Sequence, residues 1–293
     1  MKVITKSTPH PVFNACLVIV TMILTAQSFA QTLPPTNNLA AWYKPETLSS
    51  LTNGQTVTSW TDSTGNGHTI ANNTTSPSYF TNGINGRPSV FFTVSESDQL
   101  ITSSSVLLPS GMTYVAVFKT FSTDSTSSFA SDPALTLVSD STYTGSTTFG
   151  LTGGNSKFIR FDNQVSATYL NIAGSYALNN TNVYPGHYLI ATHRQDTGNA
   201  NDLASLYADG RPDGTANIPY NSLTSFDSVG RGGAGQNSFD GWIGEVLVYG
   251  TDLSTADRLQ LQTYLNERWL DIPEPSAIVM LALGGLAWLR QRR

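Results

Sequence analysis

Short apolar runs separated by polar turns recur along the middle of the chain. Residues 39–43, 112–118 and 239–249 form the clearest runs; the second is apolar on both faces and the third is the longest. Runs of this length, bounded by Gly, Asn or Asp, predict β-strands. A run that is apolar on both faces predicts a central strand. Further strands are expected at residues 57–60, 89–94, 135–138, 149–151, 158–161, 188–192 and 203–208.

Turn and cap residues divide these runs. Asp209-Gly210 predicts a tight hairpin turn, and we expect residues 218–220 to pair back on the preceding strand. Ser254 and Asp257 resemble a helix-capping box, and apolar residues at helical spacing follow them. The pattern predicts an all-β, two-sheet antiparallel sandwich of jelly-roll type that one C-terminal helix closes.

The N-terminus has the features of a secretory signal peptide. Lys2 and Lys6 precede a largely apolar stretch at residues 15–26, and Ser28 and Ala30 place small residues at the two positions that a signal peptidase reads. This order predicts cleavage between Ala30 and Gln31, with residues 1–30 removed on export. The alternative is an uncleaved membrane anchor, for which the apolar stretch is short.

The last residues, 272–293, form a separate tail. Residues 277–289 are apolar, and their length as a helix is about 20 Å, which is less than the roughly 30 Å of a bilayer core. Three arginines follow, so the positive-inside rule predicts a cytoplasmic C-terminus and an exported domain of residues 31–271. The alternative is a buried terminal helix, which would normally show a polar face. The features that define the tail are Pro273, Glu274, Pro275, Arg290, Arg292 and Arg293.

In this order, a Pro-Glu-Pro motif, a short apolar run and terminal arginines resemble the PEP-CTERM sorting signal of Gram-negative bacteria. The resemblance implies transient membrane insertion and recognition by an exosortase-type membrane peptidase that removes the tail. It also implies that the protein is delivered to the cell envelope, the cell surface or the exopolysaccharide matrix.

Charge and cysteine content narrow the possibilities further. The net charge of the chain is −5, and residues 31–272 carry nineteen Asp or Glu against ten Lys or Arg. A scattered acidic excess argues against nucleic acid as a partner. Cys16, the only cysteine, lies in the signal peptide, so the exported domain has no disulfide and burial must stabilise it.

Several short motifs resemble LamG-like, concanavalin A-like jelly-roll domains. They lie at residues 39–43, 57–67, 84–92, 207–210 and 239–246, and the closing helix follows the last of them. The resemblance spans residues 37–270 and implies binding of a polysaccharide or another surface partner. Residues 122–184 depart from the pattern, so the choice of ligand is expected to depend on them. Domains of this type often hold calcium in their rim loops.

Asp62 and Asn66 are the residues that we predict for such a calcium site. Both lie in the turn of residues 62–67, and their side chains and backbone carbonyls can supply oxygen ligands. The alternative is an Asx turn without an ion, in which the side chains bond the backbone of the turn.

Glu245 is the most informative acid for judging catalysis. It lies on the longest predicted strand and should share a face with Ile243 and Leu247, which predicts partial burial. A buried carboxylate needs a partner, and Arg87, Arg160 or the amides of residues 62–67 are candidates. Because no second acid lies in register with it, as a glycosidase would require, we interpret Glu245 as structural and the protein as not an enzyme.

Aromatic side chains decide between core and sugar-binding roles. The four tryptophans of the exported domain lie at strand or helix positions, so we expect them to pack mainly inward. Tyrosines in the divergent middle are better placed to stack on sugar rings; they are Tyr143, Tyr169, Tyr176 and Tyr184.

The sequence therefore supports an exported, non-catalytic protein with a carbohydrate-binding jelly-roll domain. Two alternatives stay open: a purely structural component of the matrix or envelope, and an enzyme that acts on polysaccharide.

Overall fold

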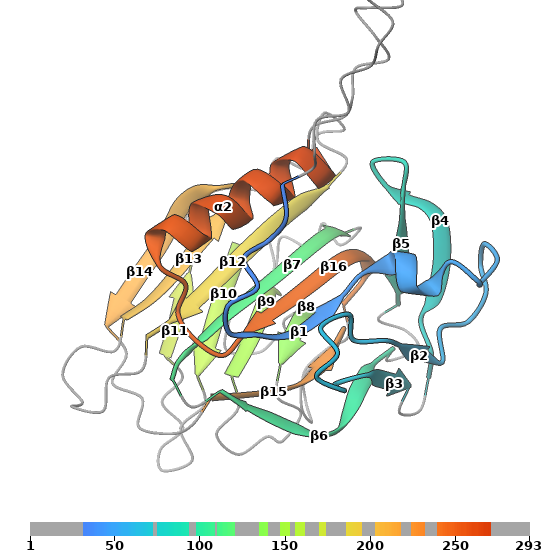
Figure 1. The fold of residues 1–293 in the computed structure, drawn as a ribbon, viewed down its shortest axis with the longest axis horizontal. Helices are drawn as coiled ribbons and strands as arrows, with labels where there is room; N and C mark the ends of the chain where they lie inside the picture. Colours follow the sequence, from blue (N-terminus) through green and yellow to red (C-terminus); the bar gives the residue numbers. More distant parts are fainter. Residues whose placement is uncertain are drawn as a thin grey trace, which may run out of the picture. The chain divides into compact units, whose positions relative to one another are not determined.

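A computed structural model describes most of the predicted exported domain. The described residues are 32–72, 75–93, 98–108, 110–120, 135–139, 147–152, 156–161, 170–173, 186–194, 203–217, 224–231 and 239–270. They form two antiparallel sheets and one C-terminal helix (Figure 1). This confirms the predicted fold class.

The first sheet carries the functional candidates. Its strand order is β14 (Arg211–Asn217), β13 (Leu203–Ala208), β12 (His187–His193), β7 (Met112–Thr120), β16 (Gly241–Tyr249), β5 (Arg87–Phe92) and β4 (Ser78–Ile84). The first strand of the chain, β1 (Leu39–Tyr43), also pairs with β16, beside its second half. The predicted central strand β7 lies between β12 and β16.

The second sheet packs on one face of the first. Its order is β11 (Leu170–Ala173), β10 (Ser156–Phe161), β9 (Thr147–Thr152), β8 (Leu135–Ser139), β15 (Thr224–Val229), β6 (Leu100–Leu108), β3 (Ile70–Asn72) and β2 (Ser59–Trp60). β2 covers only the second half of the run predicted at residues 57–60.

Alternate residues of β7 show why this strand is apolar from residue 114 to residue 118. Tyr114, Ala116 and Phe118 belong to the core between the sheets. Val115 and Val117 belong to a second core beneath the helix. Because successive side chains of a strand point to opposite faces, a strand covered on both sides needs apolar residues at every position.

The helix α2 (Thr255–Leu265) covers the outer face of the first sheet and continues as the π-helical turn η3 (Asn266–Leu270). Ser254 caps it, since its Oγ accepts a hydrogen bond from the backbone N–H of Asp257 at 3.1 Å. Leu261 and Leu265 pack above β7, β12 and β16. Figure 1 shows β4 and β5 on the other side of the view from α2, away from the helix.

The predicted hairpin at Asp209-Gly210 is confirmed, but its second strand is different. Asp209 and Gly210 have φ of 47° and 79°, and both positive values are typical of a two-residue hairpin turn. The return strand is β14, which begins directly after the turn and pairs with β13, whereas the sequence predicts a return strand at residues 218–220. Those three residues lie outside the described part of the chain. Because β14 ends the strand order, Pro212 is tolerated there.

The predicted signal peptide and sorting tail lie outside the described residues. In the part of the chain that the structure describes, no helix combines the length and the apolarity of a membrane span.

Candidate functional site

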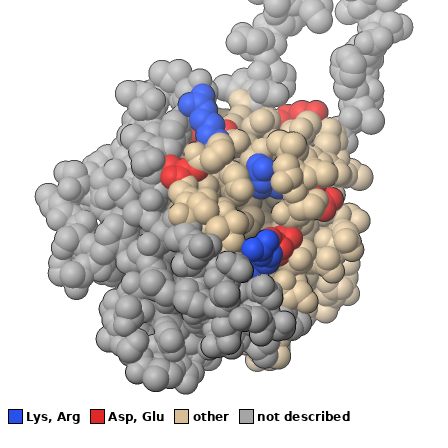
Figure 2. All heavy atoms as spheres, turned by 90° about the vertical axis from the view of Figure 1, so that its left-hand side faces the viewer, with Lys and Arg blue, Asp and Glu red and all other residues tan. Residues whose placement is uncertain are grey.

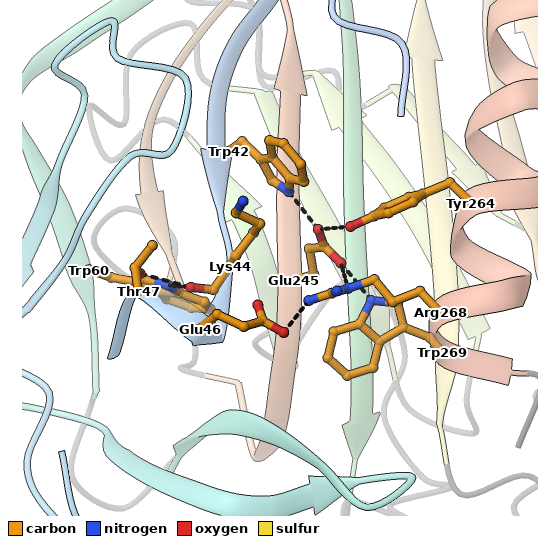
Figure 3. A network of polar contacts seen from close by, with 9 residues as sticks. All are labelled: Trp42, Lys44, Glu46, Thr47, Trp60, Glu245, Tyr264, Arg268 and Trp269. Atoms are coloured by element: carbon orange, nitrogen blue, oxygen red, sulfur yellow. Dashed lines mark hydrogen bonds and ion pairs between the residues drawn. The ribbon is translucent and has the colours of Figure 1, made fainter. Parts of the chain in front are cut away.

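A buried carboxylate at the centre of the first sheet organises the most extensive polar network described (Figure 3). Glu245 on β16 is fully buried. Its Oε1 accepts hydrogen bonds from Trp42 Nε1 at 2.5 Å and from the Tyr264 hydroxyl at 2.6 Å. Its Oε2 accepts from Trp269 Nε1 at 2.6 Å and Arg268 Nε at 2.9 Å. Four donors thus surround one carboxylate.

A β-bulge turns Glu245 towards these donors. The pairing of β16 with β7 shifts register between Ile243 and Glu245, so that Gly244 is an extra residue. Ile243 therefore faces the core between the sheets, while Leu247 faces the helix, as Glu245 does. Our expectation that Ile243 shares the face of Glu245 is wrong, because one inserted residue reverses the alternation of side chains.

Gly244 also makes room for one of the donors. A β-carbon at this position would lie 2.6 Å from the indole ring of Trp269. Only a residue without a side chain allows the ring to pack directly on the bulge.

The C-terminal helix supplies the other donors through its last turns. Tyr264 and Arg268 are four residues apart, and Trp269 is five residues from Tyr264. A π-helical turn closes i→i+5 hydrogen bonds, so residues four and five apart can reach one face. The π-turn therefore brings both Arg268 and Trp269 to the same carboxylate.

Arg268 links Glu245 to the surface. Its Nη2 lies 2.5 Å from Oε1 of Glu46 in the 3₁₀ turn η1 (Pro45–Leu48), and the Glu46 side chain is 49% exposed. Burial opposes the charge of Arg268, but the two carboxylates and Tyr264 outweigh it and raise the pKa of Arg268. The prediction that Arg87, Arg160 or the loop amides pair with Glu245 is wrong, because Trp42, Tyr264, Arg268 and Trp269 fill its hydrogen-bonding positions.

This arrangement is unsuited to acid–base catalysis. A general acid or base must reach a substrate proton, whereas Glu245 is enclosed and all its hydrogen bonds go to protein. The network instead ties β1, β16 and the helix together. The interpretation of Glu245 as a structural carboxylate agrees with its burial and its four donors.

Four of the buried tyrosines have strongly raised pKa values. Burial is the main cause for each, and a nearby carboxylate adds to it. They are Tyr43, Tyr188, Tyr249 and Tyr264. All four therefore stay neutral in the folded protein at pH values where a free tyrosine ionises.

Asp62 forms the turn that supports β1. Its carboxylate accepts bonds from the backbone N–H groups of Trp42, Thr64 and His68 at 2.9–3.2 Å, and from the Thr64 hydroxyl. Asn66 directs its amide nitrogen to the carbonyl oxygens of residues 39 and 40. The turn therefore holds β1 in place.

These residues, as arranged, do not fit a calcium ion. Calcium takes six to eight oxygen ligands at about 2.3–2.6 Å. Both oxygens of Asp62 already accept N–H or O–H donors, and Asn66 presents a nitrogen to its partners. Among the described residues, no group of three or more His, Cys, Asp or Glu lies close enough to hold a metal.

The tryptophans divide into two pairs. Trp60 and Trp269 are buried, as expected, but Trp42 and Trp242 are partly exposed. Trp242 lies with Phe80 and Phe91 on the outer face of the first sheet, and we call these three residues the aromatic patch. Their ring centroids are 5.3–6.4 Å apart. The patch is not predicted from the sequence, although alternation along β5 places Phe91 and the buried Phe92 on opposite faces of the sheet.

The remaining sequence-based site residues lie outside the described part of the chain. They are Ala30 and Gln31 at the predicted cleavage site, the residues of the tail, and the four tyrosines of the divergent middle. On the face drawn in Figure 2, the coloured basic and acidic side chains are few and interspersed among uncharged ones.

Comparisons with known proteins extend the description of the fold. No protein-family model and no curated protein sequence matches the chain. One similar solved structure is domain 4 of AbnA, a GH43 extracellular arabinanase from Geobacillus stearothermophilus, in complex with arabinotriose. It has 13% identity and a TM-score of 0.51, and the match covers 78% of this chain and 98% of that domain.

A second similar structure is the receptor-binding domain of botulinum neurotoxin type G. It has 14% identity and a TM-score of 0.52, and the match covers 78% of this chain and 51% of that one. At these identities the likeness concerns the fold. The chain therefore has the antiparallel β-sandwich fold that these domains share, closed on one face by its C-terminal helix.

Proposed function

We propose that this protein is an exported, non-catalytic polysaccharide-binding protein of the cell surface or its exopolysaccharide matrix. The observation that carries the proposal is the likeness to the arabinanase domain, which is bound to arabinotriose in its structure and matches over 98% of its length. The same architecture here presents partly exposed aromatic rings, which suit the apolar faces of sugars.

The enclosed Glu245 supports binding rather than hydrolysis. Glycosidases need two carboxyl groups that flank the scissile bond. The largest polar network of the described residues uses its buried acid to fasten the helix to the sheet. We therefore expect the protein to bind a polysaccharide and to leave its chain intact.

We further propose that residues 273–293 act as a PEP-CTERM-like sorting signal that an exosortase-type peptidase recognises. Their Pro-Glu-Pro motif, apolar run and arginines support this. The described ends of the domain are compatible with it. Thr32 bonds to Glu267 through its N–H at 3.0 Å and its hydroxyl at 3.1 Å, three residues before Leu270. The first and last described segments of the domain therefore lie side by side.

The test is a binding screen against neutral and acidic polysaccharides. A protein of residues 32–293, purified in mild detergent, is passed over immobilised polymers. We expect saturable retention by at least one polymer and no new reducing ends after prolonged incubation. If the folded protein binds none of the polymers, the proposal is wrong and a purely structural role takes its place. If new reducing ends appear, the protein is an enzyme that acts on polysaccharide.

A further inference from the structure

The outer face of the first sheet combines aromatic rings with a lysine. Lys119 on β7, Trp242 on β16 and Phe91 on β5 are register partners in one row across three neighbouring strands. The neighbouring strand β4 adds Phe80, whose ring makes edge contacts with both Phe91 and Trp242. All four side chains are partly exposed.

The helix leaves this row uncovered. Its side chains share a core with Val115 and Val117 of β7 and with Leu247 and Tyr249 of β16, and Trp242 packs against the edge of this core. Lys119 and Trp242 lie further along the same strands, beyond Trp269 on Gly244. The aromatic patch therefore begins where the cover of the helix ends.

Lys119 is the charged element of this surface. Its Nζ lies 5.1 Å from the centroid of the Trp242 ring. No described carboxylate pairs with it, whereas Arg268 on the same face of the sheet has two. In a chain with a net charge of −5, a lysine that has no acidic partner among the described residues and lies beside partly exposed rings is suited to an anionic ligand.

We propose that the aromatic patch and Lys119 bind an acidic polysaccharide, a chain of pyranose units that carry carboxylates. This inference rests on the proposed polysaccharide binding and names its site and ligand class. A uronic acid has an apolar C–H face, which packs on the rings of the patch, and a carboxylate, which pairs with the ammonium of Lys119. A neutral sugar uses only the first of these contacts.

The control for Lys119 is Arg258. Its guanidinium lies 4.2 Å from the centroid of the Tyr207 ring on β13, and it too is partly exposed. β13 is separated from β7 by β12, on the side away from the aromatic patch. Both residues are thus cations over an aromatic ring of the first sheet, and only Lys119 belongs to the proposed site.

The experiment measures affinity for alginate, a polyuronate, and for neutral arabinan, with residues 32–293. We expect Lys119→Glu to weaken alginate binding about tenfold, because an attraction is replaced by repulsion. Lys119→Arg should restore it, and Arg258→Glu should leave it within about twofold. Phe80→Leu with Phe91→Leu, which removes two rings but keeps apolar volume, should weaken it about tenfold. Raising NaCl from about 0.05 to 0.5 M should also weaken it.

The outcomes separate this inference from the proposed function. If the protein binds arabinan but not alginate, or if Lys119→Glu and Arg258→Glu weaken alginate binding equally, the inferred site is wrong and polysaccharide binding stands. If the folded protein binds neither these polymers nor any in the wider screen, both fail. A dimer in sedimentation experiments that Phe80→Leu with Phe91→Leu dissociates would also overturn the site, because a second copy then covers the patch.

Discussion

Replacing Glu245 by glutamine should be among the most destabilising single-atom changes in this domain. The glutamine keeps the shape of the side chain, and its carbonyl oxygen can still accept two of the four hydrogen bonds. Its NH2 group faces the other two donors and cannot accept hydrogen bonds from them. The change also removes the charge that balances the buried Arg268.

The magnitude follows from these losses. A hydrogen bond to a charged group contributes about 1.5–3 kcal/mol, so the loss of two costs about 3–6 kcal/mol. Removing one partner of a buried ion pair costs about 3–5 kcal/mol, which gives the same range. For a domain of this size, about 4 kcal/mol lowers the melting temperature by about 8–16 °C.

Glu46→Gln is the matched control, because it removes the other carboxylate of the same arginine. The Glu46 side chain is 49% exposed, so we expect a loss below about 1 kcal/mol. Urea titration followed by tryptophan fluorescence is the assay, since Trp42 and Trp269 both bond to Glu245. Equal losses for the two variants would refute the reasoning. If Glu245→Gln does not fold, Trp269→Phe removes one donor and should cost about 1.5–3 kcal/mol.

Four further predictions test other parts of the structure. Gly244→Ala should lower the free energy of unfolding by about 1–3 kcal/mol, because the added methyl group overlaps the Trp269 ring. Gly250→Ala should be nearly neutral in the same titration, because its methyl group would lie 3.9 Å from the nearest side-chain atom, on Leu108. Calcium or a chelator should leave the melting temperature unchanged, because Asp62 is already satisfied; a rise with calcium would contradict this. The free energy of unfolding should fall as pH rises above about 10, because the unfolded chain releases phenolic protons that the folded chain keeps. The loss is up to about 1.4 kcal/mol per pH unit for each of Tyr43, Tyr188, Tyr249 and Tyr264. An alkaline titration in which stability does not change up to about pH 12 would contradict this. Replacing Arg290, Arg292 and Arg293 by serine in the full chain should leave the tail uncleaved in an exosortase-containing host, as mass spectrometry would show.

The fold could be predicted because its signals are local. The middle of strand β7 is apolar because both its faces are covered. The Asp209-Gly210 turn fixes a hairpin by its backbone conformation alone. The Ser254 cap likewise marks the start of the helix. The sequence places the return strand at residues 218–220, whereas β14 begins at Arg211. A two-residue turn begins the return strand at once, and the poor strand formers Pro212 and Gly214 conceal it.

The partners of Glu245 were not predictable in the same way. Arg268 and Trp269 come from a π-helical turn, and Trp42 comes from a strand some two hundred residues earlier in the chain. Ordinary helical spacing places Tyr264 and Arg268 on one face but moves Trp269 off it. Predicting the aromatic patch requires knowing which strands are neighbours in the sheet. The sequence of each strand does not contain that information.

The bulge at Gly244 connects these failures. With strict alternation, Glu245 would point with Ile243 into the core between the sheets and away from its four donors, and that core is lined mainly by apolar side chains. An unpaired carboxylate there would cost several kcal/mol or stay protonated. The extra residue Gly244 reverses the alternation of side chains along β16, so that Glu245 faces the helix. Because Gly244 has no side chain, the Trp269 ring can pack on the bulge. That single glycine therefore allows the last turn of the helix to contact the sheet beside the aromatic patch.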